Sequence, residues 1–399
     1  MKALKNTFLI LSVLLWGFVM QVSAGEYRNP TGKEFPILAW YSVLPKDATR
    51  QRYEELREAG FNMSTSDFKT LQETLDALKL CHGTGVKIVV SCPEMFEDET
   101  IRLLSKKKDN VAYFLRDEPT PKDFPELKKL YDKIRAIDSS RPVYLDLFPT
   151  YVPIEALGTR DYREYMELSI QQVGTGFISF DHYPILSQGM RPDYFENLEI
   201  ALELGKKYGQ PFWAFVLSNP HGDYPVPERS HMRLQAFCNL AYGAQALQYF
   251  TYWYAIIRPD GGRSETFDLV ADLNREIQNL SWVFLGAEVL EVGHTGDSIP
   301  QGTNPISYLP KQIKSVSSNG EGLLVSHLRN GKKDFLMVVN RSRFQRQLAT
   351  IELEDDVQRV LPSGKTCSAK LYSKEMWMDS GDYLLYEWDN TNLKSHKKK

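Results

Sequence analysis

Short apolar stretches recur along most of this chain at intervals of roughly 25 to 35 residues, and helical patterns fill the segments between them. This is the spacing of successive βα units. Parallel neighbouring strands need a crossover helix, so eight such units in a row favour a closed barrel over an open doubly wound sheet. The predicted fold class is therefore α/β, a (β/α)8 TIM barrel. Its strands are expected at residues 37–43, 61–66, 86–92, 111–116, 143–148, 177–181, 212–217 and 246–253.

The intervening segments have apolar residues at helical spacing, and several are followed by a glycine that can end a helix. No GxGxxG or GxxxxGKS phosphate loop opens any of these segments, which argues against a nucleotide-binding sheet. A last barrel helix is expected at residues 267–285. The other clear helices are predicted at residues 50–59, 71–83, 124–137 and 194–208.

Beyond residue 315 the pattern changes to strand-length runs separated by turns. Asn330-Gly331 between two such runs is a strong hairpin signal, and Ser363-Gly364 marks another turn. A small antiparallel β-sandwich is therefore predicted after the barrel. Its strands are expected to include residues 323–328, 335–340, 348–353 and 383–388.

The first residues are basic, residues 8–20 are apolar, and Val22-Ser23-Ala24 offers small residues for cleavage. This is the pattern of a secretory signal, and the apolar run is too short for a comfortable membrane span. We expect cleavage after Ala24 and a secreted or periplasmic product without a membrane span. The chain then divides into signal peptide 1–24, barrel 25–289, linker 290–314, β-sandwich 315–392 and basic tail 393–399.

The formal net charge is −3, and the one basic run is the C-terminal tail, so no nucleic-acid partner is expected. The four cysteines have no metal-type spacing and do not indicate disulfides. The seven histidines are dispersed, without an HExxH motif. No metal and no organic cofactor are therefore expected, and the oligomeric state is left open.

The strand predicted at 111–116 ends abruptly in Asp117 and Glu118, followed by Pro119. Carboxylates at the exit of a buried strand stand where desolvation can raise a pKa toward the range of a general acid. The structural alternative is that both acids only cap a helix beginning near Pro121.

The remaining strand ends also carry carboxylates and aromatics, and the 21 Tyr, 20 Phe and 7 Trp exceed what a core needs. Since the C-terminal strand ends of such a barrel meet at one mouth, this mixture suits a carbohydrate site, where aromatic faces stack on sugar rings. Structural alternatives are that Asp146 bonds only backbone or Arg141, that His182 is a core histidine, and that the aromatics pack within the barrel. The other strand-end candidates are Trp40, Tyr41, Asp67, Glu94, Asp181, Tyr183, Ser218, Asn219, His221, Tyr252 and Trp253.

Three strand ends resemble those of the large clan of (β/α)8 retaining glycoside hydrolases that includes cellulases and β-galactosidases. They are Arg116-Asp117-Glu118-Pro119, the 181–184 segment Asp-His-Tyr-Pro and the aromatic run 249–253. The resemblance covers residues 36–286 and implies that Glu118 is the general acid. Asp117 stands where the clan has an asparagine, so its contact to the sugar would be that of an acceptor. The seventh strand ends in Leu217-Ser218, without the clan's nucleophilic glutamate.

Asp181 is the first choice for the missing carboxylate because strand ends are more firmly placed than loops. Asp146 and Glu228 are the alternatives. Depending on its separation from Glu118, Asp181 would act as nucleophile in a retaining mechanism or as base in an inverting one.

The sequence thus predicts an exported glycoside hydrolase acting on an oligo- or polysaccharide, with Glu118 and Asp181 catalytic. A non-catalytic carbohydrate-binding barrel that has lost its nucleophile is the competing hypothesis. The predicted substrate-binding residues are Trp40, Tyr41, Asp67, Asp117, Asp146, His182, Tyr183, Tyr252 and Trp253.

Overall fold

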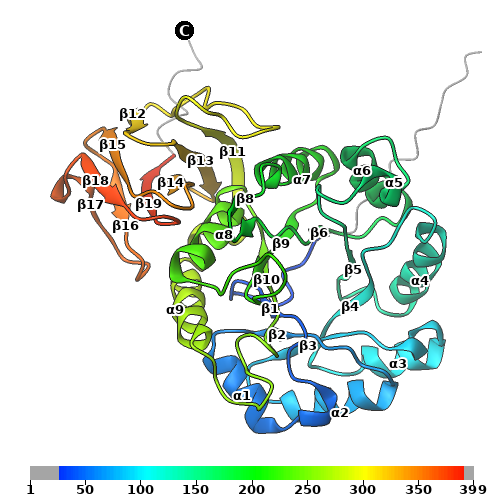
Figure 1. Cartoon of the computed structure of the whole chain (residues 1–399). Helices are drawn as coiled ribbons and strands as arrows, with labels where there is room; N and C mark the ends of the chain where they lie inside the picture. The colour runs from blue at the N-terminus through cyan, green and yellow to red at the C-terminus, as the bar shows by residue number, and fades with distance from the viewer. Residues whose placement is uncertain (1–26, 391–399) are drawn as a thin grey trace, which may run out of the picture.

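The computed structural model describes residues 27–390 and contains a barrel of parallel strands ringed by helices, with a β-rich domain against one side (Figure 1). The predicted barrel is confirmed: seven strands lie within their expected segments, and β4 exceeds its segment by one residue at each end. The barrel strands are β1 (Ile37–Ala39), β2 (Met63–Ser64), β3 (Lys87–Val90), β4 (Asn110–Asp117), β5 (Val143–Asp146), β6 (Ile178–Phe180), β9 (Phe212–Leu217) and β10 (Ala246–Phe250).

The hydrogen-bonded order of the strands is β5-β4-β3-β2-β1-β10-β9-β6, all parallel. The two end strands of this sheet meet through a parallel bridge between Leu147 and Phe180, in which the Leu147 N–H donates to the Ser179 carbonyl over 2.9 Å. The sheet is therefore nearly closed, and the strand ends that carry the predicted acids lie around one opening.

Helices cover the outside of the barrel between successive strands (Figure 1). The hydroxyls of Thr49 and Thr70 accept N–H bonds at the starts of the first two, and Gly209 ends another in the left-handed conformation. The helices are α1 (Arg50–Glu58), α2 (Leu71–Cys81), α3 (Asp98–Ser105), α4 (Phe124–Ile137), α6 (Tyr162–Gln172), α7 (Tyr194–Tyr208), α8 (Arg229–Ala241) and α9 (Thr266–Asn279); short α5 (Ile154–Leu157) precedes α6.

Large aromatic side chains fill the interior of the barrel. The rings of Phe177 and Trp213 stack with centroids 4.2 Å apart, and Tyr144 packs against both. Outward residues of the same strands, such as Ile37 and Ala39, join a second cluster beneath the helices. This packed interior closes the barrel below its C-terminal mouth, so a ligand can enter only at the mouth.

The C-terminal part is an antiparallel β-sandwich, as the hairpin at Asn330-Gly331 predicts. Alternate residues of its central strands point to different cores. Leu323 and Val325 pack between the two sheets, whereas Leu324 joins the cluster shared with the barrel. One sheet contains β11 (Glu288–His294), β13 (Leu323–Asn330), β14 (Lys333–Asn340), β19 (Tyr383–Asp389), β16 (Gln358–Val360) and β17 (Thr366–Ser368), and the other β12 (Ile313–Ser318), β15 (Gln347–Leu353) and β18 (Glu375–Met378).

Two segments differ from the sequence prediction. The expected linker 290–314 contains most of β11, which pairs with β13 and so belongs to the sandwich. The expected helix 267–285 is interrupted at Leu280, where α9 gives way to α10 (Ser281–Phe284). The predicted signal peptide 1–24 and basic tail 393–399 lie outside the described residues. Within the described part of the chain, no helix has the length and apolarity to cross a membrane.

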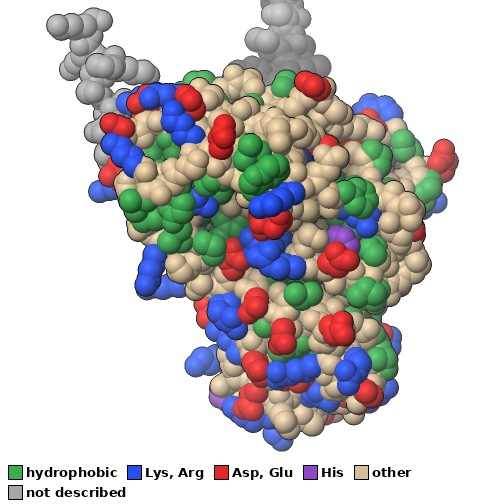
Figure 2. All heavy atoms as spheres, turned by 60° about the vertical axis from the view of Figure 1, so that its left-hand side comes forward, with side chains coloured by type: hydrophobic (Ala, Val, Ile, Leu, Met, Phe, Trp, Pro, Cys, Tyr) green, Lys and Arg blue, Asp and Glu red, His purple; other side chains and the backbone are tan. Residues whose placement is uncertain are grey.

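Acidic and basic side chains are interspersed on the face shown in Figure 2, in keeping with the net charge of −3. No single-sign patch dominates this face.

A buried ionic cluster joins the barrel to the sandwich. Arg233 of α8 donates to Glu276 of α9 over 2.6 Å and to Asp382 of the sandwich over 2.8 Å. The Tyr383 hydroxyl also donates to Glu276, over 2.7 Å. The Arg233 side chain is only 8% exposed, so its charge is compensated almost entirely by these two acids.

We predict that Arg233→Ala lowers the free energy of unfolding by about 3 kcal/mol or more, because it leaves Glu276 and Asp382 without their buried partner. Arg229→Ala is the matched control, since Arg229 approaches the same Asp382 at 3.7 Å but is 64% exposed. Urea denaturation of both variants measures the difference. Equal stabilities of the two variants would contradict this assignment.

Candidate functional site

A hollow of about 290 Å³ opens where the C-terminal ends of the barrel strands meet. Four carboxylates and several aromatic rings line it, which is the residue mixture that the strand ends predict. The lining residues are Trp40, Asp117, Glu118, Asp146, Tyr151, Asp181, Tyr183, Phe215, His221, Tyr224 and Phe250.

Glu118 follows β4 directly, and its N–H donates to the Asp146 carbonyl over 2.9 Å. Its φ of 45° lies in the left-handed region, which costs a non-glycine residue about 1 kcal/mol or more. Burial, together with the charge of Asp117, raises the pKa of the Glu118 carboxyl to about 7. The acid is therefore largely protonated below neutral pH, the state from which it can donate a proton.

Asp117 lies at the open rim, where part of its side chain reaches solvent. Burial by the surrounding walls still raises its pKa to about 6. Neither Asp117 nor Glu118 caps the following helix. That turn is held by Asp123, whose carboxylate accepts the Thr120 N–H over 2.8 Å and pairs with Arg116 over 2.7 Å. Asp117 and Glu118 thus remain directed to the hollow.

Asp146, at the end of β5, is 1% exposed and forms the floor of the hollow. Its Oδ1 accepts the Ser179 hydroxyl over 2.5 Å, and Ser179 Oγ accepts Gln248 Nε2 over 2.8 Å. The Oε1 of Gln248 in turn accepts Trp40 Nε1 over 3.1 Å. The second oxygen of Asp146 has no hydrogen-bond partner. Arg141, the alternative partner suggested by the sequence, binds Asp138 instead.

Asp181 stands one residue beyond β6 and shares the hollow with Glu118. Burial, with the nearby charges of Glu118 and Asp117, raises the pKa of Asp181 well above its usual range, whereas a hydrogen bond from Tyr183 lowers it. Its Oδ1 is buried without a partner. Burial and the charges of Asp181 and Asp117 raise the pKa of Asp146, so these carboxylates repel one another and form one electrostatic group.

Several lining residues come from loops, and the sequence analysis did not select them. Tyr151 follows β5, and Tyr224 follows β9; Arg191 lies 3.8 Å over the Tyr151 ring and donates to the Tyr224 hydroxyl over 3.1 Å. Phe250, the last residue of β10, stacks on Tyr183 with ring centroids 5.7 Å apart. Because Tyr151 and Tyr224 lie in loops, no alternating pattern of a strand marks them in the sequence as residues that face the hollow.

A second hollow of about 170 Å³ adjoins the first, and Trp40 and Asp117 line both. It contains the predicted residues Tyr41 and Asp67. The carboxylate of Asp67 pairs with Lys69. Together the two hollows form an extended mouth with a continuous aromatic and acidic lining.

Three predicted binding residues lie elsewhere, which corrects their assignment. His182 is 1% exposed and faces α7, because successive residues after β6 alternate between the hollow and the barrel exterior. It packs against Tyr151 from behind, and its Nε2 lies 3.5 Å from Asp193. Tyr252 is buried against Phe61.

Trp253 is buried beneath Arg52, in a separate hollow beside α1. The chain after β10 turns outward, with the Trp253 N–H bonded to the Tyr41 carbonyl.

At the end of β9, Ser218 donates to the Thr251 carbonyl. Glu228 precedes α8 and does not line the hollow.

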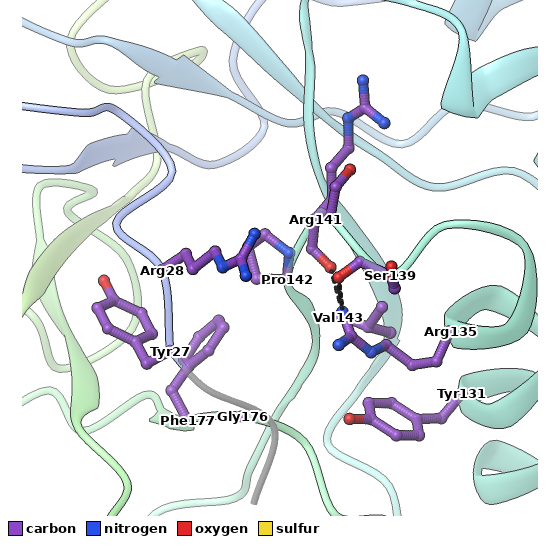
Figure 3. Close-up of a pocket in the computed structure, with 11 residues that line it drawn as sticks. Tyr27, Arg28, Tyr131, Arg135, Ser139, Arg141, Pro142, Val143, Gly176 and Phe177 are labelled. Carbon is purple, nitrogen blue, oxygen red and sulfur yellow. Dashed lines mark hydrogen bonds between the residues drawn. The ribbon is translucent and has the colours of Figure 1, made fainter.

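Another hollow, of about 240 Å³, lies at the opposite end of the barrel, beside the start of β5 (Figure 3). Arg135 and Arg141 project from its wall, and Arg135 donates to the Ser139 carbonyl over 2.8 Å. Active sites of such barrels form at the C-terminal mouth, so the acidic hollow is the candidate site.

The sandwich supports one wall of this mouth. Arg343 donates to the carbonyls of Leu186 and Gly189 in the hairpin β7 (Ile185–Leu186) and β8 (Gly189–Met190). The hairpin in turn holds the loop that carries Tyr224, since the Ser187 N–H donates to the Asp223 carbonyl over 2.8 Å. A sandwich residue thus helps to position lining residues of the hollow.

We predict that Arg343→Ala speeds amide hydrogen exchange in the 185–190 hairpin, which includes Ser187, by about tenfold, because the hairpin loses two charge-assisted bonds. Exchange read by mass spectrometry measures the effect. Arg346→Ala is the control, since Arg346 lies on the exposed Trp377 and pairs with Asp379. Unchanged exchange in Arg343→Ala would rule out this support.

Within residues 27–390, no group of three or more His, Cys, Asp or Glu side chains is arranged to hold a metal ion. The four cysteines are free thiols, three of them buried.

No family model matches this chain, and no curated protein matches it. Among solved structures, an α-amylase from Geobacillus thermoleovorans, complexed with acarbose, is similar over 90% of this chain and 99% of its own, at 10% identity and a TM-score of 0.55. A family 39 glycoside hydrolase from the gut symbiont Bacteroides cellulosilyticus WH2 matches 90% of this chain and 82% of its own, at 8% identity and a TM-score of 0.53.

A β-galactosidase from the psychrophilic Marinomonas ef1 matches 62% of this chain and 60% of its own, at 11% identity and a TM-score of 0.46. At these identities the likeness is one of fold. Because the matches to the α-amylase and to the family 39 glycoside hydrolase cover 90% of this chain, the shared fold includes both the barrel and the sandwich.

Proposed function

We propose that this protein is an exported glycoside hydrolase that cleaves an oligo- or polysaccharide with Glu118 as general acid and Asp181 as the second carboxylate. The main support is that Glu118, with its pKa raised to about 7, shares one hollow with the partly unpartnered Asp181. The fold shared with glycoside hydrolases agrees with this proposal.

In the proposed reaction the protonated Glu118 donates its proton to the glycosidic oxygen as the bond to the anomeric carbon breaks. The leaving group departs as an alcohol, and Glu118 is left as a carboxylate. Its raised pKa makes the proton available near neutral pH, and its position at the rigid exit of β4 fixes the direction of donation.

Asp181 completes the reaction in one of two ways. As a nucleophile it bonds the anomeric carbon, and water then releases the sugar while Glu118 takes the proton of that water. As a base it removes the proton from a water that attacks the anomeric carbon directly. The Tyr183 hydroxyl, which donates to Asp181, stabilises the ionised form in both cases.

The remaining lining supplies binding surfaces. The rings of Trp40, Tyr183 and Phe250 offer faces for the sugar, and Asp117 at the rim accepts a hydrogen bond from a sugar hydroxyl. Tyr41 and Asp67 in the adjoining hollow would contact a neighbouring sugar unit.

A non-catalytic carbohydrate-binding protein is the second candidate, favoured by the absence of a carboxylate at the end of β9, where Leu217 and Ser218 stand. Both candidates bind sugar, but only the hydrolase consumes it.

The proposal of export rests on the basic, apolar and small residues of the N-terminus. We predict that mass spectrometry of the exported protein finds Gly25 or a near neighbour as its first residue. Exported material that keeps Met1 would contradict this.

We predict that Glu118→Gln lowers turnover by about 10² to 10⁴, because general acid catalysis contributes that much. Since Glu118 acts in its protonated form and its folded pKa is about 7, wild-type kcat/KM should fall as the pH rises through about 7. Substrates with poor leaving groups and circular dichroism of the variant test this. Full turnover of a folded Glu118→Gln would remove Glu118 from the mechanism.

We predict that Asp181→Asn abolishes hydrolysis but leaves sugar binding largely intact, because the amide keeps the volume and loses the basicity. Azide, a small anionic nucleophile, should restore release of an activated leaving group in Asp181→Ala, whose shorter side chain leaves room for the anion. NMR of the product from the wild-type enzyme distinguishes retention from inversion. Full activity of Asp181→Asn would move the role to Asp146.

A further inference from the structure

Within residues 27–390, the acidic hollow has no lysine or arginine in its lining, and His221 is its one imidazole. Asp117, Glu118, Asp146 and Asp181 all face it, and none of the described residues that line it is Lys or Arg. A sugar that enters this hollow therefore meets four carboxyl groups and no lysine or arginine from the part of the chain that the structure describes.

The basic side chains nearby are directed to other partners. Arg191 is stacked on Tyr151 and bonded to Tyr224, Lys69 pairs with Asp67, and Arg116 pairs with Asp123. None of these cations lines the hollow. No lysine or arginine of the described chain therefore pairs with a carboxyl group of the cluster within the hollow.

Asp146 gives a second, independent observation. Its side chain is 1% exposed, its Oδ1 is held by Ser179, and its Oδ2 is buried with no partner. A buried carboxylate oxygen without a donor is costly, so a native protein usually supplies one or binds a ligand that does. Asp181 leaves its Oδ1 unpartnered in the same hollow.

We propose that the sugar unit bound in this hollow carries a positively charged amino group, as a 2-amino-2-deoxy sugar with a free amine does, and that Asp146 is its principal partner. This inference rests on the proposed function, since it assumes that the hollow binds a sugar.

An ammonium group has the chemistry that the hollow lacks. It brings a positive charge and three donors, so it can bond the free oxygens of Asp146 and Asp181 together. An N-acetylated sugar brings one neutral N–H, and a uronic acid brings a carboxylate that the cluster repels. Burial and mutual repulsion raise the pKa of Asp181, and a bound cation would lower that pKa and favour the ionised form. The substrate would thus help to ionise the second carboxylate.

Isothermal titration calorimetry of the full-length Glu118→Gln variant at pH 6.5 tests this without turnover. The probes are glucosamine trimer, N-acetylglucosamine trimer, cellotriose and trigalacturonate. We expect glucosamine trimer to bind at least about tenfold more tightly than the neutral trimers, the effect of one charge-assisted bond. Trigalacturonate should be the weakest ligand.

The double variant Glu118→Gln/Asp146→Asn should lose this preference, with about tenfold weaker binding of glucosamine trimer and little change for cellotriose. Glu118→Gln/Asp132→Asn is the control, because Asp132 pairs with Lys128 on the exposed side of α4, lines neither hollow and should change glucosamine binding by less than about threefold. Circular dichroism confirms that each variant is folded.

Neutral trimers that bind as tightly as glucosamine trimer would overturn the amino-sugar proposal and leave the proposed hydrolase standing. A preference that survives Asp146→Asn would overturn the role of Asp146. If wild-type protein hydrolyses none of the glycans and no trimer binds, the proposed function fails together with this inference.

Discussion

One chain of hydrogen bonds beneath the mouth determines how the acidic hollow is built. It runs from the Trp40 indole through Gln248 and Ser179 to Asp146 and so ties together β1, β10, β6 and β5. This chain of bonds holds one oxygen of Asp146 in place, whereas the second oxygen has no hydrogen-bond partner. The aromatic floor of Tyr144, Phe177 and Trp213 lies within the barrel and keeps water out from below.

The carboxylates above this chain are kept close by backbone as well as by side chains. The Glu118 N–H bonds the carbonyl of Asp146, so two of the four acids are linked through adjacent strands. The strained φ of Glu118 and the raised pKa values are costs that a purely structural surface would not need. Strain and unpaired charge concentrated at one mouth are typical of a binding or catalytic site.

The sequence predicts the barrel well because each strand is a short apolar run and Gly209 marks a helix end without ambiguity. It also selects Asp117, Glu118, Asp146 and Asp181, since strand ends of one barrel must converge. It does not say which way a strand-end side chain points. The two-residue alternation sends His182 outward between Asp181 and Tyr183, and the turn after Phe250 carries Trp253 away. Tyr151 and Tyr224 lie in loops, where tertiary contacts alone set their positions.

The main sheet of the sandwich is covered on both of its faces, by the small sheet on one side and by the barrel helices on the other. Removal of either half of the molecule would therefore expose buried apolar side chains of the other half to water. A barrel cut off after residue 286 would expose the apolar sides of α8 and α9, and it would deprive Arg233 of Asp382 and Glu276 of the Tyr383 hydroxyl. Truncation after the barrel should accordingly yield insoluble protein, and engineering of this chain has to treat it as one folding unit.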